Sequence, residues 1–179
     1  MKAFAKEMGE IDTCGHIVLS RSRSNAVSSN VIGAAAYFGK AKLISKVLAI
    51  MDEKAINHPA TEEKDLDSKI TFKTEFEGYT PIMLAVVSPH SDLETIKQLL
   101  AHKVDYTVKE KGTNNNLLHL CAERGNSDRV FDYLMKNLNL DSSEANAEGE
   151  TPLSICIREK NAKRIKIAEE VQSTYDKSG

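Results

Sequence analysis

The stretch Gly78 to Ala85, GYTPIMLA, indicates the architecture because its pattern returns at Gly149 to Cys156 as GETPLSIC. A related pattern begins at Asn116, which stands where the other two copies have threonine. The interval from Thr80 to Asn116 is 36 residues, and the interval from Asn116 to Thr151 is 35 residues. A motif that recurs at such a period is typical of stacked copies of one structural unit.

Two residue types in this pattern have a physical reason to begin a helix. Thr80 and Thr151 each offer a hydroxyl oxygen that can accept a hydrogen bond from a free backbone N–H group at a helix start. Pro81 and Pro152 follow at the first helical position, where a missing N–H costs nothing. Asn116 is an equally good cap in its copy. A short helix is therefore expected to begin at each site.

A turn and a second helix are expected to follow each short helix. Gly39 and Gly125 can adopt the left-handed conformation that ends a helix, whereas Lys160 occupies this position in the last copy. Because such helix pairs are too short to bury an apolar face alone, about three or more copies must stack. The second helices carry apolar residues at helical spacing, namely Leu43, Val47 and Ile50; Leu93, Ile96, Leu99 and Leu100; Val130, Tyr133 and Leu134; and Ile165 and Ala168.

These motifs resemble the ankyrin repeat. The segments at Gly78 and Gly149 are similar to the family's opening G-x-T-P-L-H-x-A, and Leu118 to Gly125, LHLCAERG, is similar to its continuation L-H-L-A-A-x-x-G. The resemblance implies an all-α fold, an ankyrin-repeat solenoid of stacked helix-turn-helix units with short hairpin-like loops. It also implies that His119 bridges neighbouring units by hydrogen bonds, as the motif histidine does in the family.

The resemblance covers roughly Ser24 to Gln172 and predicts about four repeats, of which the first and last are degenerate caps. The first copy, which begins at Asn30, keeps small residues and Gly39 but lacks the threonine, proline and histidine. In the last helix, Lys163, Arg164, Lys166, Glu169 and Glu170 are expected to supply the polar outer face of a C-terminal cap. The predicted divisions are an N-terminal segment 1–24, repeats at 25–51, 75–108, 111–144 and 146–172, an insertion at 52–73 and a tail at 173–179.

The first two copies are separated by more than one period. Asn30 to Thr80 is 50 residues, about fifteen more than the repeat requires. The charged runs at 52–54 and 61–67 indicate a solvated loop, which we interpret as a tolerated surface insertion, with a binding loop as the alternative. Pro89 is expected to halt the first helix of the second copy and to leave a longer turn there.

The N-terminal segment allows two interpretations. Met1 to Glu10 can form a short helix with Phe4 and Met8 on one side, covering the first unit. The run Ser20 to Ser24, SRSRS, is interpreted as a flexible linker, with phosphorylation of its serines as the alternative.

Composition limits the class of protein. A chain of 179 residues that is 41% hydrophobic can bury one continuous core, and no apolar run reaches the roughly 18 residues of a membrane span. The net charge of −2 gives no broad basic field for nucleic acid. Three cysteines, no glycosylation motif and no signal-peptide pattern indicate a reducing compartment, either cytoplasm or nucleus. Neither nucleic acid nor membrane insertion is expected.

The residues offer no argument for catalysis. Cys121 and Cys156 are 35 residues apart and so occupy equivalent, core-facing helix positions. Stacked units would hold them too far apart for a disulfide, which needs Cα atoms within about 7 Å. Neither cysteine has a second ligand pair that would build a zinc site, and no glycine-rich phosphate loop or G-x-S-x-G motif occurs. We therefore expect no enzyme activity, cofactor or metal.

The resemblance places partner binding on the concave side, formed by the hairpin tips and the exposed side of each first helix. The aromatic residues there, Tyr37, Phe38, Phe76 and Tyr79, have the makeup of a binding hot spot. The alternative, that Phe38 or Phe76 packs under the adjacent insertion, stays open. The predicted partner-binding residues are Tyr37, Phe38, Phe76, Glu77, Tyr79, Ser88, Thr113, Asn115, Glu123, Arg124, Glu148, Glu150 and Arg158.

The function predicted from sequence is a non-catalytic protein-interaction module, monomeric on its own, that recognises a protein partner through a rigid curved surface. One alternative is a targeting or substrate-recruiting domain of a larger enzyme, such as a ubiquitin ligase, kinase or acyltransferase. Another is an inhibitor-type ankyrin protein that masks a transcription factor. Ankyrin surfaces vary while the framework stays fixed, so the sequence does not name the partner.

Overall fold

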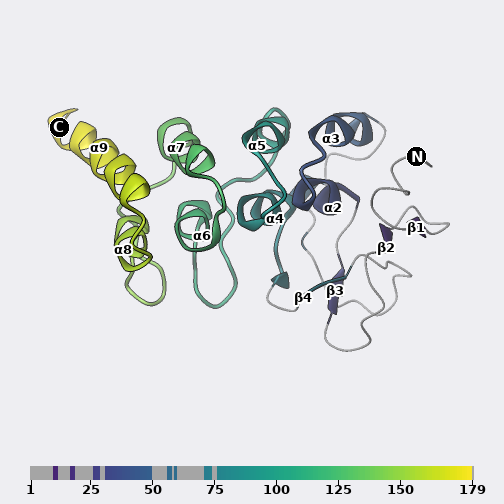
Figure 1. Cartoon of the computed structure of the whole chain (residues 1–179), viewed down its shortest axis with the longest axis horizontal. Helices are drawn as coiled ribbons and strands as arrows, with labels where there is room; N and C mark the ends of the chain where they lie inside the picture. Colours follow the sequence, from purple (N-terminus) through teal and green to yellow (C-terminus); the bar gives the residue numbers. More distant parts are fainter. Residues whose placement is uncertain are drawn as a thin grey trace.

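The computed structural model describes residues 10–11, 17–18, 26–28, 31–49, 56–57, 59, 71–73 and 76–178. Over these residues the helices form four successive pairs in two layers (Figure 1). Each helix packs against its counterpart in the next pair, which confirms the predicted all-α repeat stack. The first helices are α2 (Val31–Tyr37), α4 (Pro81–Val87), α6 (Leu117–Arg124) and α8 (Pro152–Arg158). The second helices are α3 (Ala41–Leu48), α5 (Leu93–Leu100), α7 (Asp128–Asn137) and α9 (Ala162–Ser178). We call the successive pairs units 1 to 4.

The predicted caps differ between units. In unit 4, the Thr151 hydroxyl accepts a hydrogen bond from the backbone N–H of Ser154 at 3.2 Å. In unit 2, Thr80 occupies the cap position, but its buried hydroxyl has no hydrogen-bond partner among the described residues. The expectation that this hydroxyl caps α4 is corrected. Every residue of α4 is buried, so packing rather than a side-chain cap stabilises this helix.

Two of the helix-ending positions also behave differently. Gly39 has a φ of 64°, and a Cβ atom there would lie 2.3 Å from the carbonyl oxygen of His90. Gly125 has a φ of −65°, so the expected left-handed ending is wrong. A side chain is excluded at Gly125 for a different reason, because a Cβ atom would lie 2.4 Å from the carbonyl oxygen of Cys121. Lys160, in unit 4, adopts the left-handed conformation with a φ of 55°.

Part of the predicted insertion is built into the fold. Strand β4 (Thr71–Lys73) pairs antiparallel with β3 (Ala26–Ser28), which precedes α2. Ile56 is buried, and the Asn57 side chain bonds to the carbonyl oxygen of Lys103 and the backbone N–H of Asp105. The description of 52–73 as one solvated loop is therefore wrong for these residues, because an apolar side chain and strand hydrogen bonds hold them in place.

The ends of the chain also depart from expectation. Strands β1 (Glu10–Ile11) and β2 (Ile17–Val18) form a short antiparallel pair, so Glu10 does not end a helix. Residues 1–9 and the serine-arginine run at 20–24 lie outside the described residues. Helix α9 continues to Ser178 through the predicted tail, since this segment contains neither glycine nor proline. The remaining repeat boundaries stay a prediction.

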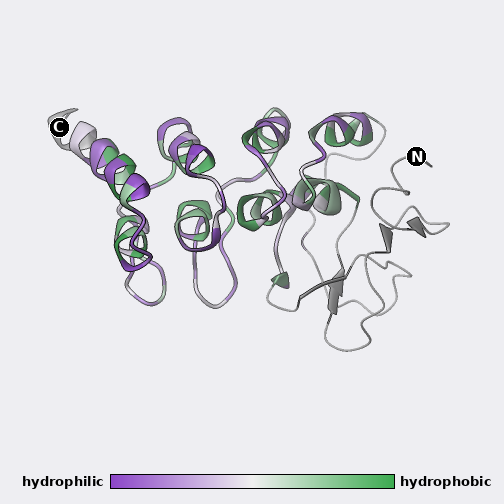
Figure 2. Cartoon of the chain, viewed as in Figure 1, coloured by the Kyte–Doolittle hydropathy of each residue, from purple (hydrophilic) through white to green (hydrophobic). Residues whose placement is uncertain are grey.

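The core runs along the stack between the two layers. Figure 2 shows hydrophobic colouring around α4 and α6, whereas the second helices carry hydrophilic faces. Arg164, which was expected on the outer face of a cap, is instead buried against unit 3, and we describe its contacts below. Among the described residues, no helix is both long enough and apolar enough to cross a membrane.

Candidate functional site

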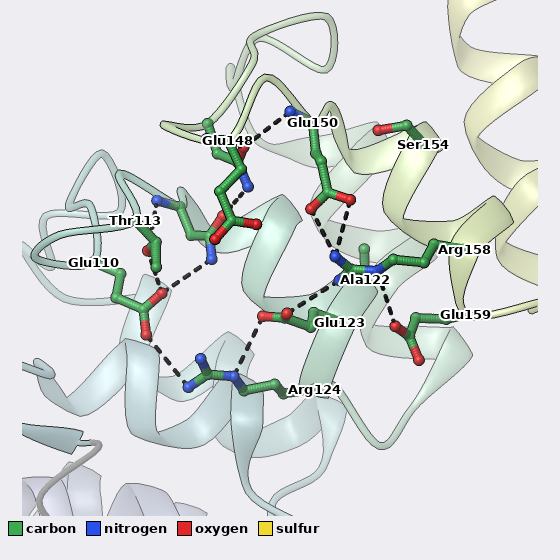
Figure 3. A network of polar contacts seen from close by, with 12 residues as sticks. Glu110, Thr113, Ala122, Glu123, Arg124, Glu148, Glu150, Ser154, Arg158 and Glu159 are labelled. Carbon is green, nitrogen blue, oxygen red and sulfur yellow. Dashed lines mark hydrogen bonds and ion pairs between the residues drawn. The ribbon is translucent and has the colours of Figure 1, made fainter.

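The loops before α4, α6 and α8, together with the adjoining sides of these helices, carry one continuous network of polar side chains (Figure 3). We call this side, formed by the loops 76–80, 110–116 and 146–151 and the neighbouring helix faces, the loop surface. Figure 3 shows Arg124 between Glu110 and Glu123, and Arg158 among three glutamates. The network joins units 2, 3 and 4.

Glu110 forms the buried end of the network. One carboxylate oxygen accepts a hydrogen bond from the Tyr79 hydroxyl, and the other accepts from the Thr113 hydroxyl and from the Asn115 amide at 3.0 Å. The guanidinium of Arg124 lies 3.3 Å from Glu110 and donates to the Tyr79 oxygen at 2.7 Å. Burial alone would raise the pKa of Glu110, but these donors outweigh it and hold the pKa below its ordinary value. Glu110 is therefore a satisfied buried anion.

Tyr79 is the hydrogen-bond partner of Glu110 and is itself buried. Its side chain is 1% exposed, so it cannot be reached by a partner. Burial, followed by the hydrogen bond to Glu110, raises the pKa of the phenol far above its ordinary value. Tyr79 therefore stays protonated and acts as a donor to Glu110.

Arg158 forms the exposed end of the network. Its Nη1 atom lies 2.9 and 2.8 Å from the two carboxylate oxygens of Glu150, and its Nη2 atom donates to Glu123 at 3.1 Å. Its Nε atom lies 3.2 Å from Glu159. Exposed pairs of this kind add little stability individually, but the shared arginine fixes the relative positions of the glutamates.

The two loops of the C-terminal half are tied directly to each other. The Asn146 amide donates to the Asn115 side-chain oxygen at 2.8 Å, and both groups are buried. The backbone N–H of Ala147 donates to the carbonyl oxygen of Thr113 at 2.8 Å. The Asn146 side chain also accepts from the backbone N–H groups of Glu148 and Glu150. These bonds make loops 110–116 and 146–151 one connected structure.

His119 connects the same units beneath the surface. Its Nε2 atom lies 3.1 Å from the carbonyl oxygen of Glu150, and its Nδ1 atom lies 3.3 Å from the backbone nitrogen of Asn116. A carbonyl oxygen only accepts, so Nε2 carries the proton and Nδ1 accepts from the Asn116 N–H. Burial lowers the pKa of His119 below its ordinary value, in spite of the backbone hydrogen bond to Glu150. The neutral ring is the form that makes this bridge.

Aromatic rings gather at the other end of the loop surface. Tyr37 lies 5.2 Å from Phe38 and 6.1 Å from Phe76 between ring centroids, and Phe76 lies 5.3 Å from Tyr79. His90 stacks on Phe38 at 5.6 Å. Phe76 is 9% exposed, whereas Tyr37 and Phe38 are half-buried. The rings therefore pack mainly on one another, in the edge and stacked geometries that aromatic pairs favour.

The predicted partner-binding residues fall into three groups. Phe76, Tyr79, Ser88 and Asn115 are buried, so the expectation that they are open to a partner is corrected. Their side chains are used inside the protein, as for Ser88, which donates to the carbonyl oxygen of Tyr37. The half-buried residues are Tyr37, Phe38, Thr113, Glu123 and Glu150, and the exposed residues are Glu77, Arg124, Glu148 and Arg158.

Sequence reasoning missed Glu110 and Asn146, which organise the loops. The backbone N–H of Glu110 donates to the carbonyl oxygen of Asn115, and that of Asn146 donates to the carbonyl oxygen of Glu150. The two residues are 36 positions apart, one repeat period, so the spacing alone could have found them. One residue is a glutamate and the other an asparagine, so a comparison of residue types does not show that their positions are equivalent.

Arg164 joins unit 4 to the end of α6. It donates to the carbonyl oxygens of Cys121 at 2.8 Å and Gly125 at 2.7 Å, and its Nε atom lies 2.9 Å from the carboxylate of Asp128. Its guanidinium also lies over the ring of Phe131. The arginine therefore supplies a charged donor to two carbonyl groups at the end of α6, and the Cys121 carbonyl oxygen also accepts from the backbone N–H of Gly125 at 3.0 Å.

The two described cysteines are packed into the core. Cys121 and Cys156 are both free and buried. Burial raises the pKa of Cys121 to about 12 and that of Cys156 to about 11, so both remain thiols at neutral pH. Within the described part of the chain, no group of histidine, cysteine and acidic side chains has the arrangement of a metal site.

Comparison with known families agrees with this geometry. Residues 88–173 match the family model described as ankyrin repeats, three copies. No curated protein matches the sequence significantly. The matched residues include α5 to α8 and the part of α9 up to Ser173. The stack of four helix pairs continues beyond the match through α4 and the first unit. Ankyrin repeats generally act through protein–protein contacts. Residues 88–173 are therefore a segment of ankyrin repeats.

Proposed function

We propose that this chain is a non-catalytic protein-interaction module that binds a protein partner on the loop surface. The exposed members of the predicted set, Glu77, Arg124, Glu148 and Arg158, supply the contacts. The buried members, including Tyr79 and Asn115, hold the surface in shape rather than contacting the partner.

The observation that carries this proposal is the linkage between the loops. Asn146 bonds to Asn115, and Arg158 joins Glu123 of α6 to Glu150 of the next loop. A surface that is already ordered loses less conformational entropy on binding than a mobile one. This preorganisation supports recognition by the loops and not only by the helices.

The charge of the loop surface indicates the chemistry of the partner. In the network, Glu110, Glu123, Glu148, Glu150 and Glu159 outnumber Arg124 and Arg158. Both arginines already contact glutamates of this chain. The excess charge is therefore negative, and we propose that the partner presents lysine or arginine side chains to Glu77 and Glu148.

The compartment proposed for this interaction is the cytoplasm or nucleus. Cys121 and Cys156 are free thiols, as is usual for proteins kept in a reducing environment. This part of the proposal would be tested by fluorescence imaging of a tagged chain in its native cells.

The experiment is affinity capture from native lysate with matched charge reversals. The test variant is Glu77→Lys with Glu148→Lys, both exposed on the loop surface. The control is Glu94→Lys with Asp132→Lys, which makes the same charge change on α5 and α7. We expect the test variant to lose the partner that the intact chain and the control capture.

Circular dichroism would confirm that both variants remain helical. A partner captured equally by the test variant and by the intact chain would place the interface elsewhere. A partner lost only by the control would assign it to the second-helix layer. Either result would refute binding at the loop surface.

A further inference from the structure

The layer of second helices carries a hollow that is separate from the loop surface. It lies between α7 and α9 and reaches Leu93 of α5, and we call it the outer hollow. Its volume is about 810 Å³, within the range of about 300–1,000 Å³ that is usual for ligand sites. Figure 1 shows α7 and α9 side by side, on the far side of the first helices from the loops 110–116 and 146–151.

Part of the lining of the outer hollow is apolar. Leu93, Tyr133 and Ile167 come from three different helices, and each is half-buried. Lys97 of α5 lies over the Tyr133 ring, with its Nζ atom 5.4 Å from the ring centre. The three apolar side chains keep part of their surface in contact with water, so a ligand that covers them would bind favourably.

The two acidic side chains of the lining are already neutralised within the chain. Asp128 lies 2.9 Å from the Nε atom of the buried Arg164 and accepts a hydrogen bond from the Asn161 amide at 3.3 Å. Asp132 lies 2.5 Å from the Nζ atom of Lys136. Neither Arg164 nor Lys136 belongs to the lining, so these pairs leave the cations of the hollow unused.

The three cations of the lining have much weaker partners. The side chain of Lys163 is 82% exposed, and its Nζ atom lies 3.9 Å from Asp128. The side chain of Lys166 is 79% exposed, and its Nζ atom lies 4.0 Å from Glu170. The exposed guanidinium of Arg129 makes no hydrogen bond or ion pair with the described residues. Exposed pairs at such distances contribute little, so the charges available to a ligand are positive.

The combination of apolar and cationic lining selects the kind of ligand. Arg129 comes from α7, whereas Lys163 and Lys166 come from α9, so cations border the apolar side chains on two helices. The continuous phosphate chain of a nucleic acid would be repelled by Asp128 and Asp132 in the same hollow. A peptide can instead place an apolar side chain against the apolar lining and its carboxylates beside the cations.

We propose that the outer hollow is a second interaction surface, which binds an acidic peptide segment of a partner protein. An apolar side chain of the segment packs on Tyr133 and Ile167, and carboxylates on either side of it pair with Arg129, Lys163 and Lys166. This surface is distinct from the loop surface, for which we propose a basic partner, so either proposal can fail without the other.

The first test measures the binding of short fluorescein-labelled peptides to the intact chain by fluorescence anisotropy. Each probe has a central leucine or phenylalanine flanked by aspartates and glutamates. Matched peptides replace the central residue with serine or the acidic residues with lysine. We expect the probes to bind with dissociation constants below about 1 mM, and both matched sets to bind at least about 5-fold more weakly. Absence of binding by every probe would overturn the proposal, as would equal binding of either matched set.

The second test locates the bound peptide. Lys163→Glu with Lys166→Glu should weaken binding at least about 10-fold. The control is Lys42→Glu with Lys46→Glu, which makes the same charge change at exposed positions of α3 and should leave binding unchanged. Circular dichroism would verify that both variants stay helical. Unchanged binding by the test variant would overturn the proposal, and so would a loss of binding that the control shows equally or alone.

A third variant, Asp132→Asn, gives a result that a damaged fold cannot imitate. It removes one carboxylate from the lining and releases Lys136 from its ion pair. We expect the acidic probes to bind about 2- to 3-fold more tightly, and this gain to disappear in about 1 M salt, where charges are screened. Unchanged or weaker binding in low salt would contradict the assignment of the carboxylate-binding cations.

Discussion

The joint between units 1 and 2 is built differently from the joint between units 3 and 4. At the first joint, α2 packs on α4, a helix buried along its whole length, and aromatic rings from Tyr37 and Phe76 meet beside it. At the last joint, His119 bonds to the Glu150 backbone and Arg164 bonds to the end of α6. One joint is mainly apolar, and the other is strongly polar.

This difference determines how each joint responds to change. Apolar contacts are not directional, so a similar side chain can replace another at modest cost. Buried polar contacts depend on both partners, because removing one leaves the other unsatisfied. The last joint should therefore be sensitive to pH and to single substitutions, and the first joint should be much less so.

Arg164→Met should give the largest effect. The substitution leaves the carbonyl oxygens of Cys121 and Gly125 without a charged donor. It also removes the 2.9 Å contact with Asp128, which keeps only its longer contacts with Asn161 and Lys163. We expect the free energy of unfolding in urea to fall by about 3 kcal/mol. Arg164→Lys, which keeps the charge but not the forked donor geometry, should recover only part of this loss. A decrease below about 0.5 kcal/mol, within the usual range for surface substitutions, would show that the contacts of Arg164 do not stabilise the last joint.

His119→Gln should remove a pH dependence. The pKa of His119 is lowered in the folded state. As pH falls below the unfolded-state histidine pKa of about 6.5, the unfolded state therefore binds more protons than the folded state. The stabilisation is complete above that pH and is lost as pH decreases towards the folded-state pKa. Urea titrations between pH 5 and 7.5 should show a smaller decrease in stability for His119→Gln than for the unchanged chain. Parallel curves would contradict this role.

Tyr79→Phe sharpens the comparison where the aromatic and charged regions meet. The variant keeps the ring contact with Phe76 but removes the hydroxyl between Glu110 and Arg124. We expect a loss of about 1.5 kcal/mol, measured by urea unfolding. Phe76→Leu, which changes only apolar packing, is the comparison and should cost about 1 kcal/mol. A larger cost for Phe76→Leu would mean that rings, not polar bonds, hold the loop surface.

The two capping threonines give the smallest expected difference. Thr151→Val removes a hydroxyl that accepts a hydrogen bond and should cost about 1 kcal/mol. Thr80→Val removes a buried hydroxyl without a hydrogen-bond partner among the described residues, so it should be neutral or slightly stabilising. The comparison is made by thermal unfolding. Equal destabilisation by both substitutions would show that Thr80 also caps its helix.

The repeat fold could be predicted because its signals are local. The motif that recurs at Thr80, Asn116 and Thr151 and the apolar pattern of the second helices each lie within a single unit, and the copies can be compared directly along the sequence. The cap of Thr151 and the position of Pro152 follow from the needs of a helix start. These features need no knowledge of distant residues.

The site was harder to predict because burial at a loop depends on residues far away in sequence. From the sequence, Tyr79 is expected at the surface. In the structure it is buried, and its hydroxyl donates a hydrogen bond to Glu110 of the next loop. From the sequence, Arg164 is expected to be a surface charge. In the structure it is buried and donates to carbonyl oxygens at the end of α6. Charged and aromatic residues can serve either a surface or an interior, and only the packed structure distinguishes the two.

The most direct test of the account is hydrogen exchange of the chain with and without its captured partner. Binding at the loop surface predicts slower exchange for backbone amides in 110–116 and 146–151, with no change in the exposed turns after α5 and α7. Slower exchange confined to α5 and α7, with loops 110–116 and 146–151 unchanged, would contradict the proposal that the linked loops form the recognition surface.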